Sequence, residues 1–347
     1  CLCSFLLSVW LADDIESACC AVVLGGTVAE CAAFLVQLFL FSGERRAARK
    51  NKRHAPDGAD SGDVGDVNRR LLHIALPVAF SAYLRSGLVT LEHLLIPRGL
   101  QKSGSSREIS LAAYGTLHSM VFPLVLFPSA ISASFAGLLI PEISEAKAAG
   151  KEEEIKKIVD KVLNCVLTYA IGTAGIMMCF AYEIGNAVYP TAGTGAYLLA
   201  VAPLIPVMYL DTAVDSILKG IGQQFYCMAV NLVDASLSVL LVWLLLPSMG
   251  IKGYLVTVYF TEILNGALSL ARLLTVCPVK AKIFHRILRP VVCIVLATAS
   301  SRLFLHALGA FSGTRLDTFL HVSAAVLLYA ALILLFRIPK KRRQSAT

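Results

Sequence analysis

Charged residues are scarce in this chain of 347 residues. They make up 16% of it, against about a quarter in soluble domains, while 57% of the residues are hydrophobic and the mean hydropathy is +0.72. This shortage of charge excludes an ordinary soluble domain. The apolar residues form long runs separated by short charged stretches, which predicts an all-α, polytopic transmembrane helix bundle.

Motifs of catalysis and of nucleotide binding are missing as well. The sequence contains no Gly-x-Ser-x-Gly, no His-Glu-x-x-His and no phosphate-binding glycine loop with Lys, and Gly220-Ile221-Gly222 lacks the rest of any nucleotide fingerprint. None of the ten cysteines forms a Cys-x-x-Cys pair, and most lie in apolar runs where a thiol acts as small apolar filler. We therefore expect neither an enzyme nor an ATP-driven pump, and no cofactor or metal.

The apolar runs predict roughly ten membrane segments. Residues 1–12 are too short to cross a bilayer alone, and we expect them to be the end of a helix whose start precedes Cys1. A basic and then Gly/Asp-rich stretch at 42–70 cannot bury a core and is expected to be a mobile linker. The full spans are expected at 17–41, 71–100, 109–140, 158–188, 195–218, 226–246, 253–276, 284–305 and 318–336.

The net charge of +8 follows the expected topology rather than indicating a nucleic-acid surface. If the linker 42–70 is cytoplasmic, alternation of the spans places 24 of the 31 Lys and Arg residues on the cytoplasmic side and six on the other. Positive charge is retained on the cytoplasmic side of membrane proteins. We therefore expect a multi-pass protein of the plasma membrane, with the linker and the basic C-terminus in the cytoplasm and no nucleic-acid partner.

The span at 71–100 carries two charges at membrane depth, Arg85 and Glu92, and Ser81 shares their helical face. Charged groups at that depth are costly and normally face a bundle interior or a wet cavity. A rise of about 1.5 Å per residue places Arg85 and Glu262 near the midplane. One interpretation is that they face a common aqueous cavity and pair without substrate; the other is a buried ion pair that only holds helices together.

Other polar residues interrupt the apolar runs and extend this set. Asp211 lies deep in its span, whereas Asp215 is expected to pair with Lys219 near the cytoplasmic surface. His93 is expected at a helix interface, since it lies about 100° around the helix from Glu92. The complete set of candidate cavity residues is Ser81, Arg85, Glu92, Asp211, Asn231, Asp234, Glu262 and Asn265.

Three runs of sequence resemble one known family. TLEHLLIPRGL (90–100), LLIPEISEAKAAG (138–150) and DSILKGIGQQ (215–224) are similar to the stage V sporulation protein B group of polysaccharide-biosynthesis membrane proteins. That group lies in the superfamily of multidrug, oligosaccharidyl-lipid and polysaccharide exporters, with the lipid II flippases. The resemblance implies the last ten or so helices of a 14-helix flippase fold.

The resemblance also implies a domain organisation and a function. Residues 1–41 would end an N-terminal lobe, 42–70 would be the linker, 71–276 the six-helix C-terminal lobe, and 277–347 two extra helices and the tail. The implied function is flipping of a lipid-linked oligosaccharide or peptidoglycan precursor across the cytoplasmic membrane by alternating access. The last two helices would flank a groove for the lipid tail, and we expect a monomer.

Two other functions remain open from the sequence. A cation-coupled multidrug exporter of the same superfamily would need a compact acidic site, for which Asp211 and Glu262 are available, and H+ or Na+ would be its coupling ion. A non-transporting membrane scaffold for envelope or spore-coat assembly would need no cavity at all.

Overall fold

The structure, a computed structural model, describes residues 15–52, 64–104, 106–190, 193–278, 283–307 and 315–337. Every element within these ranges is helical, which confirms the all-α prediction for them. The chain divides into two units, Cys1–His73 and Ile74–Thr347, and the candidate residues all lie in the second. The helix expected at 1–12 lies outside the described residues.

The first unit shows that part of the predicted linker is helical. Helix α2 runs over Ile15–Lys52, so its basic end, residues 42–52, continues the helix of the expected span. Helix α3 begins at Val64 and includes the other end of the linker. Ala, Arg, Lys and Glu are strong helix formers, and charge alone does not interrupt a helix. Residues 53–63 lie outside the described ranges.

Seven helical stretches among the described residues are long and apolar enough to cross a membrane, so the chain is a multi-pass membrane protein. Two expected spans are not among them. They fall on α3 (Val64–Lys102) and α13 (Ile283–Ala307), which carry charged residues inside the expected spans that lower their mean hydropathy. The seven are Val23–Gly43, Glu108–Leu126, Glu152–Cys179, Thr194–Gly220, Gln224–Met249, Ile251–Val276 and Asp317–Leu335.

The expected span at 109–140 contains Pro123 and Pro128, which favour a break, and the structure is broken there. Helix α4 (Arg107–Gly115) passes into a π-helical stretch, η1 (Thr116–Val121), then α5 (Phe122–Leu126) and, after a turn at Phe127 and Pro128, α6 (Ser129–Ala148). Proline has no N–H and cannot donate to the preceding turn. The break therefore exposes backbone carbonyls inside the bundle, which other groups must satisfy.

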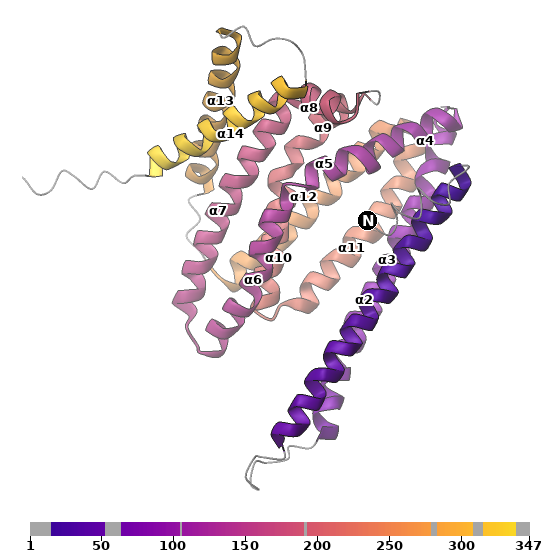
Figure 1. The fold of residues 1–347 in the computed structure, drawn as a ribbon, viewed down its shortest axis with the longest axis vertical. Coiled ribbons are helices and arrows are strands. Elements are labelled where there is room, and N and C mark those ends of the chain that lie inside the picture. The colour runs from indigo at the N-terminus through magenta and orange to yellow at the C-terminus, as the bar shows by residue number, and fades with distance from the viewer. Residues whose placement is uncertain are drawn as a thin grey trace, which may run out of the picture. The chain divides into compact units, whose positions relative to one another are not determined.

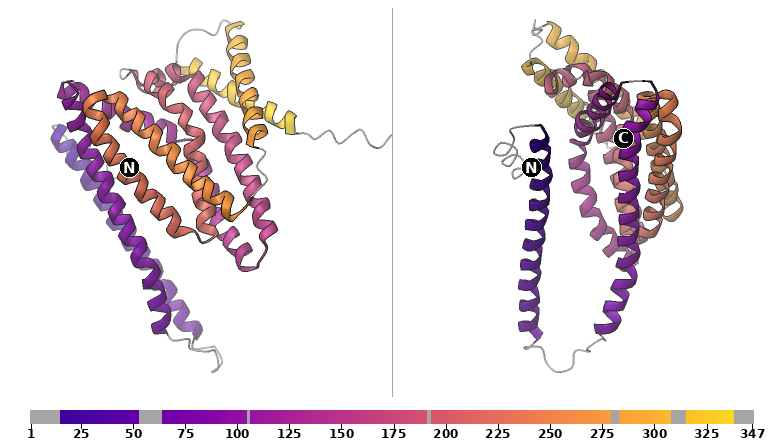
Figure 2. Two further views of the ribbon diagram at one scale, coloured as in Figure 1. Left: turned by 180° about the vertical axis from the view of Figure 1, so that it is seen from behind. Right: turned by 90° about the vertical axis from the view of Figure 1, so that its right-hand side faces the viewer.

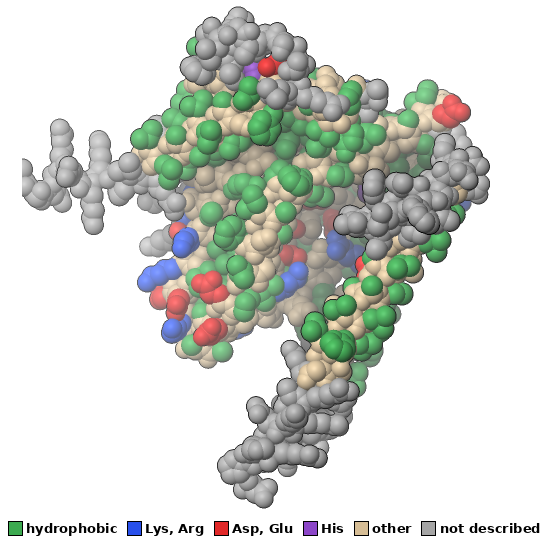
Figure 3. All heavy atoms as spheres, in the orientation of Figure 1, with side chains coloured by type: hydrophobic (Ala, Val, Ile, Leu, Met, Phe, Trp, Pro, Cys, Tyr) green, Lys and Arg blue, Asp and Glu red, His purple; other side chains and the backbone are tan. Residues whose placement is uncertain are grey.

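A charged helical hairpin joins α6 to α7 (Glu152–Cys179), as the sequence predicts (Figure 1). Lys, Arg, Asp and Glu side chains gather at this end of the molecule (Figure 3). In the first turn of α7, Lys156 Nζ lies 2.8 Å from Glu153 Oε1, an i,i+3 ion pair. Ser144 Oγ of α6 donates to the carbonyl of Gly220 at 3.1 Å, which ties the hairpin to the end of α10.

Helix α10 lies at the centre of the second unit. It packs against α6 and α7 on one side and against α11 and α12 on the other, and α11 and α12 run side by side (Figures 1 and 2). Buried residues of α10 join two hydrophobic clusters, one around Tyr209 and one around Ile217. The elements here are α9 (Thr194–Val201), η2 (Ala202–Leu204), α10 (Ile205–Gly220), α11 (Gln224–Met249) and α12 (Ile251–Val276).

The span expected at 158–188 is two helices, because α7 ends at Cys179 and α8 (Ala181–Val188) follows Phe180 directly. Helices α13 and α14 (Arg315–Arg337) pack on α7 and on each other. Gly175 of α7 makes this approach possible, since a Cβ there would lie 2.4 Å from the Ile294 side chain. Arg302 of α13 pairs with Glu183 of α8 at 3.1 Å, so Glu183 has a protein partner.

Tyrosine hydroxyls satisfy carbonyls at the breaks in the helices. Tyr209 donates to the carbonyl of Val125 at 2.6 Å, and Tyr169 donates to that of Pro128 at 2.7 Å. Tyr259 does the same for Ala200, just before η2, at 2.5 Å. A carbonyl left without a partner in an apolar interior is destabilising. The three hydroxyls therefore stabilise two breaks, one between α5 and α6 and one between α9 and α10.

We expect Tyr209→Phe to lower the free energy of unfolding by about 1–3 kcal/mol, because the buried Val125 carbonyl would lose its partner. Unfolding in detergent micelles, followed by circular dichroism during titration with a denaturing detergent, measures this. Tyr182→Phe is the control, since Tyr182 is 56% exposed. Equal stability of the Tyr209→Phe and Tyr182→Phe proteins would contradict the role given to the Tyr209 hydroxyl.

Candidate functional site

Polar side chains from α10, α11 and α12 lie at similar depth in the second unit. Counted from the end where α10 turns into α11, a rise of about 1.5 Å per residue places them roughly 10–20 Å along their helices. The hydrocarbon core is about 30 Å thick, so this is the middle of the membrane. The members, named the polar cluster below, are Asp211, Asn231, Asp234, Glu262 and Asn265.

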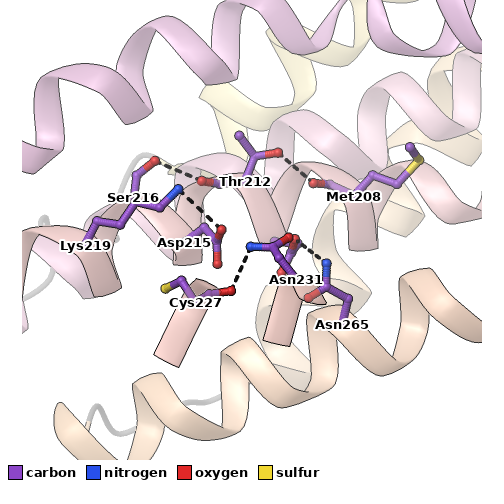
Figure 4. Close-up of polar contacts among 9 residues, drawn as sticks. Met208, Thr212, Asp215, Ser216, Lys219, Cys227, Asn231 and Asn265 are labelled. Atoms are coloured by element: carbon purple, nitrogen blue, oxygen red, sulfur yellow. Dashed lines mark hydrogen bonds and ion pairs between the residues drawn. The ribbon is translucent and has the colours of Figure 1, made fainter. Parts of the chain in front are cut away.

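Hydrogen bonds connect only part of the polar cluster (Figure 4). Asn265 Nδ2 donates to Asp211 Oδ2 at 3.3 Å, which links α12 to α10. Asn231 Nδ2 donates to the Cys227 carbonyl of its own helix at 2.8 Å. Asp215 lies one turn beyond Asp211 and pairs with Lys219 at 3.5 Å, as the sequence predicts.

Several buried oxygens of this region have no hydrogen-bond partner among the described residues. They are Asp211 Oδ1, Asp234 Oδ1 and Ser269 Oγ. Such groups are uncommon in proteins, because an unpaired polar atom away from water is costly. Three of the five such side-chain oxygens found among the described residues therefore lie on α10, α11 and α12, and Ser269 lies next to the Asp211 carboxylate.

The cluster is strongly acidic. Asp211, Asp234 and Glu262 are partly buried and lie close enough to interact electrostatically, and Asp215 adds a further carboxylate beside Asp211. Like charges at short range in a medium of low dielectric constant repel one another strongly. The cluster therefore favours a bound cation, a proton or a donor-rich ligand such as a sugar.

Arg85 is the cation placed to balance these carboxylates. It lies on α3 within electrostatic range of Asp234 and Glu262, and its side chain is exposed. Within the part of the chain that the structure describes, Arg85 has no ion pair with a carboxylate within 4.0 Å. The hypothesis that Arg85 and Glu262 form a closed pair is therefore wrong for this structure.

The remaining candidates on α3 have different surroundings. Ser81 Oγ donates to the carbonyl of Val78 on its own helix at 3.4 Å, so the structure does not bring it to the polar cluster. Glu92 lies beside Ser238 of α11 and is partly buried. His93 contacts His118 of η1, with ring centroids 4.9 Å apart, which is the helix interface expected for it.

The sequence analysis missed two serines of this region, Ser238 and Ser269. Ser269 is 1% exposed and lies four residues after Asn265, so both are on the same face of α12. The spacing of four residues between Asn265 and Ser269 is the sequence feature that could have identified Ser269. Serine is common in membrane helices as a partner of the backbone, however, and its presence in an apolar run does not by itself mark a site.

The fold and the cluster together define a class: a polytopic α-helical membrane protein with a charged polar interior. In sequence, the chain is 24% identical over 338 residues, 96% of its length, to stage V sporulation protein B of Bacillus subtilis (strain 168). It is 23% identical over 231 residues to the sporulation protein YkvU of the same organism. The chain spans 64% and 50% of these relatives, and no family model matches it.

These similarities confirm the resemblance drawn from the three sequence motifs. The structure also explains why two of those motifs occur together. Ser144 of the LLIPEISEAKAAG run donates to the Gly220 carbonyl of the DSILKGIGQQ run, and Lys147 donates to the carbonyl of Ile221. The two motifs form one contact between the α6–α7 hairpin and the turn after α10.

If the polar cluster is built for a ligand, it reduces stability without one. We expect Asp211→Asn to raise the free energy of unfolding by about 0.5–2 kcal/mol, because it removes repulsion from Asp215, Asp234 and Glu262. Denaturing-detergent titration measures the change.

Asp215→Asn is the matched control, since it lies on the same helix but loses the pair with Lys219. We expect no stabilisation from this substitution. If Asp211→Asn destabilises the protein as much as Asp215→Asn does, the repulsive cluster is not supported.

Proposed function

We propose that the protein moves a lipid-linked oligosaccharide or peptidoglycan precursor across the cytoplasmic membrane by alternating access. The observation that carries this proposal is the polar cluster with its unpartnered Asp211, Asp234 and Ser269 oxygens at mid-membrane depth. The similarity to stage V sporulation protein B supports it. We place the linker 42–70 and the C-terminus in the cytoplasm on the distribution of Lys and Arg.

The substrate's headgroup explains why these residue types are needed. A sugar pyrophosphate cannot enter hydrocarbon unaided, because its charges and hydroxyl groups would lose their hydration. Arg85 can donate to a phosphate oxygen in a charge-assisted hydrogen bond, while carboxylates and amides of the polar cluster accept from and donate to sugar hydroxyls. The polyprenyl chain stays in lipid during the passage.

An exposed Arg85 without a close carboxylate fits this role. An arginine locked in an ion pair would have to exchange one anion for another, whereas Arg85 holds its donors open. The neighbouring carboxylates keep its charge balanced until the phosphate arrives and repel the phosphate afterwards. A transport cycle needs binding that is strong enough to admit the substrate and weak enough to release it.

We expect Arg85→Ala to slow flipping of a fluorescent polyprenyl-pyrophosphate disaccharide by about 10–100-fold, the loss of one charged hydrogen bond. The assay uses proteoliposomes and measures how fast the probe becomes accessible to a membrane-impermeant quencher. Arg85→Lys should retain part of the rate.

Arg98→Ala is the matched control, because Arg98 lies on α3 thirteen residues further on and its side chain is also exposed. We expect it to leave the rate unchanged. Equal rates for Arg85→Ala and Arg98→Ala would count against phosphate recognition at Arg85.

The compact set of carboxylates favours one second candidate, a cation-coupled multidrug exporter. If the protein is such an exporter, it should drive Na+- or H+-coupled efflux of an organic cation, and Asp234→Asn and Glu262→Gln should abolish that efflux. Neither the unsubstituted protein nor any variant should then flip the lipid-linked probe. For the leading proposal, the same proteins should show no drug efflux and reduced flipping. The two assays on one set of proteoliposomes separate the candidates.

A further inference from the structure

A cavity lies away from the polar cluster, between α7, α13 and α14 and the start of α6. Its volume is about 970 Å³, within the range of small-molecule sites in proteins. All of its lining residues belong to the second unit. The polar cluster contributes no residue to the lining.

The two ends of this cavity differ in chemistry. One end is formed by Asp160 and Lys161 of α7 with Arg286 and Arg289 of α13, a net charge of about +2 at neutral pH. Toward the other end the walls are apolar and come from α7 and α14, and they include Ile176, Val322 and Val326.

The length of the cavity matches one leaflet of a bilayer. Lys161 and Ile176 are 15 residues apart on α7, which corresponds to about 22 Å along a helix. Half of a bilayer with its headgroups is also about 20–22 Å thick. The cationic end lies toward the charged α6–α7 hairpin, where a headgroup would be found.

Side-chain contacts join the three helices at the cationic end of the cavity and about halfway along it. Asp160 accepts from Arg286 and ties α7 to α13. Tyr329 of α14 donates to the Thr168 carbonyl of α7 at 2.7 Å, and its ring fills the place of the missing Gly172 side chain. The walls are therefore a fixed arrangement of three helices.

Helix α7 separates this cavity from the bundle interior. Val166, Ala170 and Ala174 of α7 are buried in the core around Tyr209, while Cys165 and Thr173 line the cavity. A lipid whose headgroup lies at Lys161 and Arg289 cannot have that headgroup at the polar cluster.

We propose that this cavity binds one anionic glycerophospholipid of the surrounding bilayer, with its phosphate at Lys161 and Arg289 and an acyl chain along α7 and α14. Basic pockets between membrane helices are suited to anionic headgroups. The bound lipid would connect α13 and α14 to α7 and thereby stabilise the C-terminal helices.

Binding can be measured on the purified chain in detergent by native mass spectrometry with dioleoyl phosphatidylglycerol. Dioleoyl phosphatidylcholine, which has the same chains and no net charge, is the matched lipid. We expect the anionic lipid to bind more tightly, and Lys161→Gln with Arg289→Gln to weaken it about 30-fold, about fivefold for each cation.

The protein control removes two cations outside the cavity, Lys151 and Lys156, which pair with Glu154 and Glu153. Lys151→Gln with Lys156→Gln should leave binding unchanged. Equal binding of the two lipids, or equal weakening by the two double substitutions, would overturn the proposal.

A second pair of variants tests the apolar wall independently of charge. Cys165→Trp should block the cavity and reduce binding of phosphatidylglycerol, while Cys165→Ser should not; equal binding by both would also overturn it. Displacement of phosphatidylglycerol by an equal concentration of undecaprenyl phosphate would assign the cavity to the polyprenyl tail instead. Because these assays read binding alone, their result is independent of the proposed flipping.

Discussion

The structure depends on one constraint, that polar groups in the middle of a membrane must find partners without help from bulk water. Backbone groups meet it by helix formation, and at the proline breaks the hydroxyls of Tyr209, Tyr169 and Tyr259 complete the pairing. Once the backbone is satisfied in this way, the remaining unpaired atoms stand out. They are concentrated around Asp211, Asp234 and Ser269.

The same constraint gives the polar cluster and the cavity beside α7 different characters. The polar cluster is acidic and includes buried carboxylate oxygens, of Asp211 and Asp234, that have no hydrogen-bond partner among the described residues. The cavity beside α7 has a cationic end and apolar walls braced by Arg286 and Tyr329. The first is rich in negative charge and the second has a cationic end, and α7 packs one face on the bundle core and lines the cavity with another.

Much of the fold could be predicted from the sequence, because apolar length and charge spacing are properties of single segments. The break near Pro123 and Pro128, the α6–α7 hairpin and the Asp215–Lys219 pair follow from local rules. The helical ends of the linker 42–70 could not be predicted in this way. The composition of a segment indicates how little of it can be buried, but it does not exclude a helix. The interruption between α7 and α8 falls at Phe180, and no proline or glycine at that position predicts it.

The candidate site shows where reasoning from depth alone is insufficient. The structure links Asp211 to Asn265 and brings Glu262 within electrostatic range of Asp211, but two charges at equal depth need not face each other, because rotation about each helix axis is set by packing. That is why Arg85 and Glu262 do not form the expected pair. The packing of α10 against both α11 and α12 instead brings carboxylates together. Because Arg85 lies within electrostatic range of Asp234 and Glu262 without forming a close pair, it offsets this repulsion only in part, and the remaining cost of the buried carboxylates stays in the energetics of the folded state.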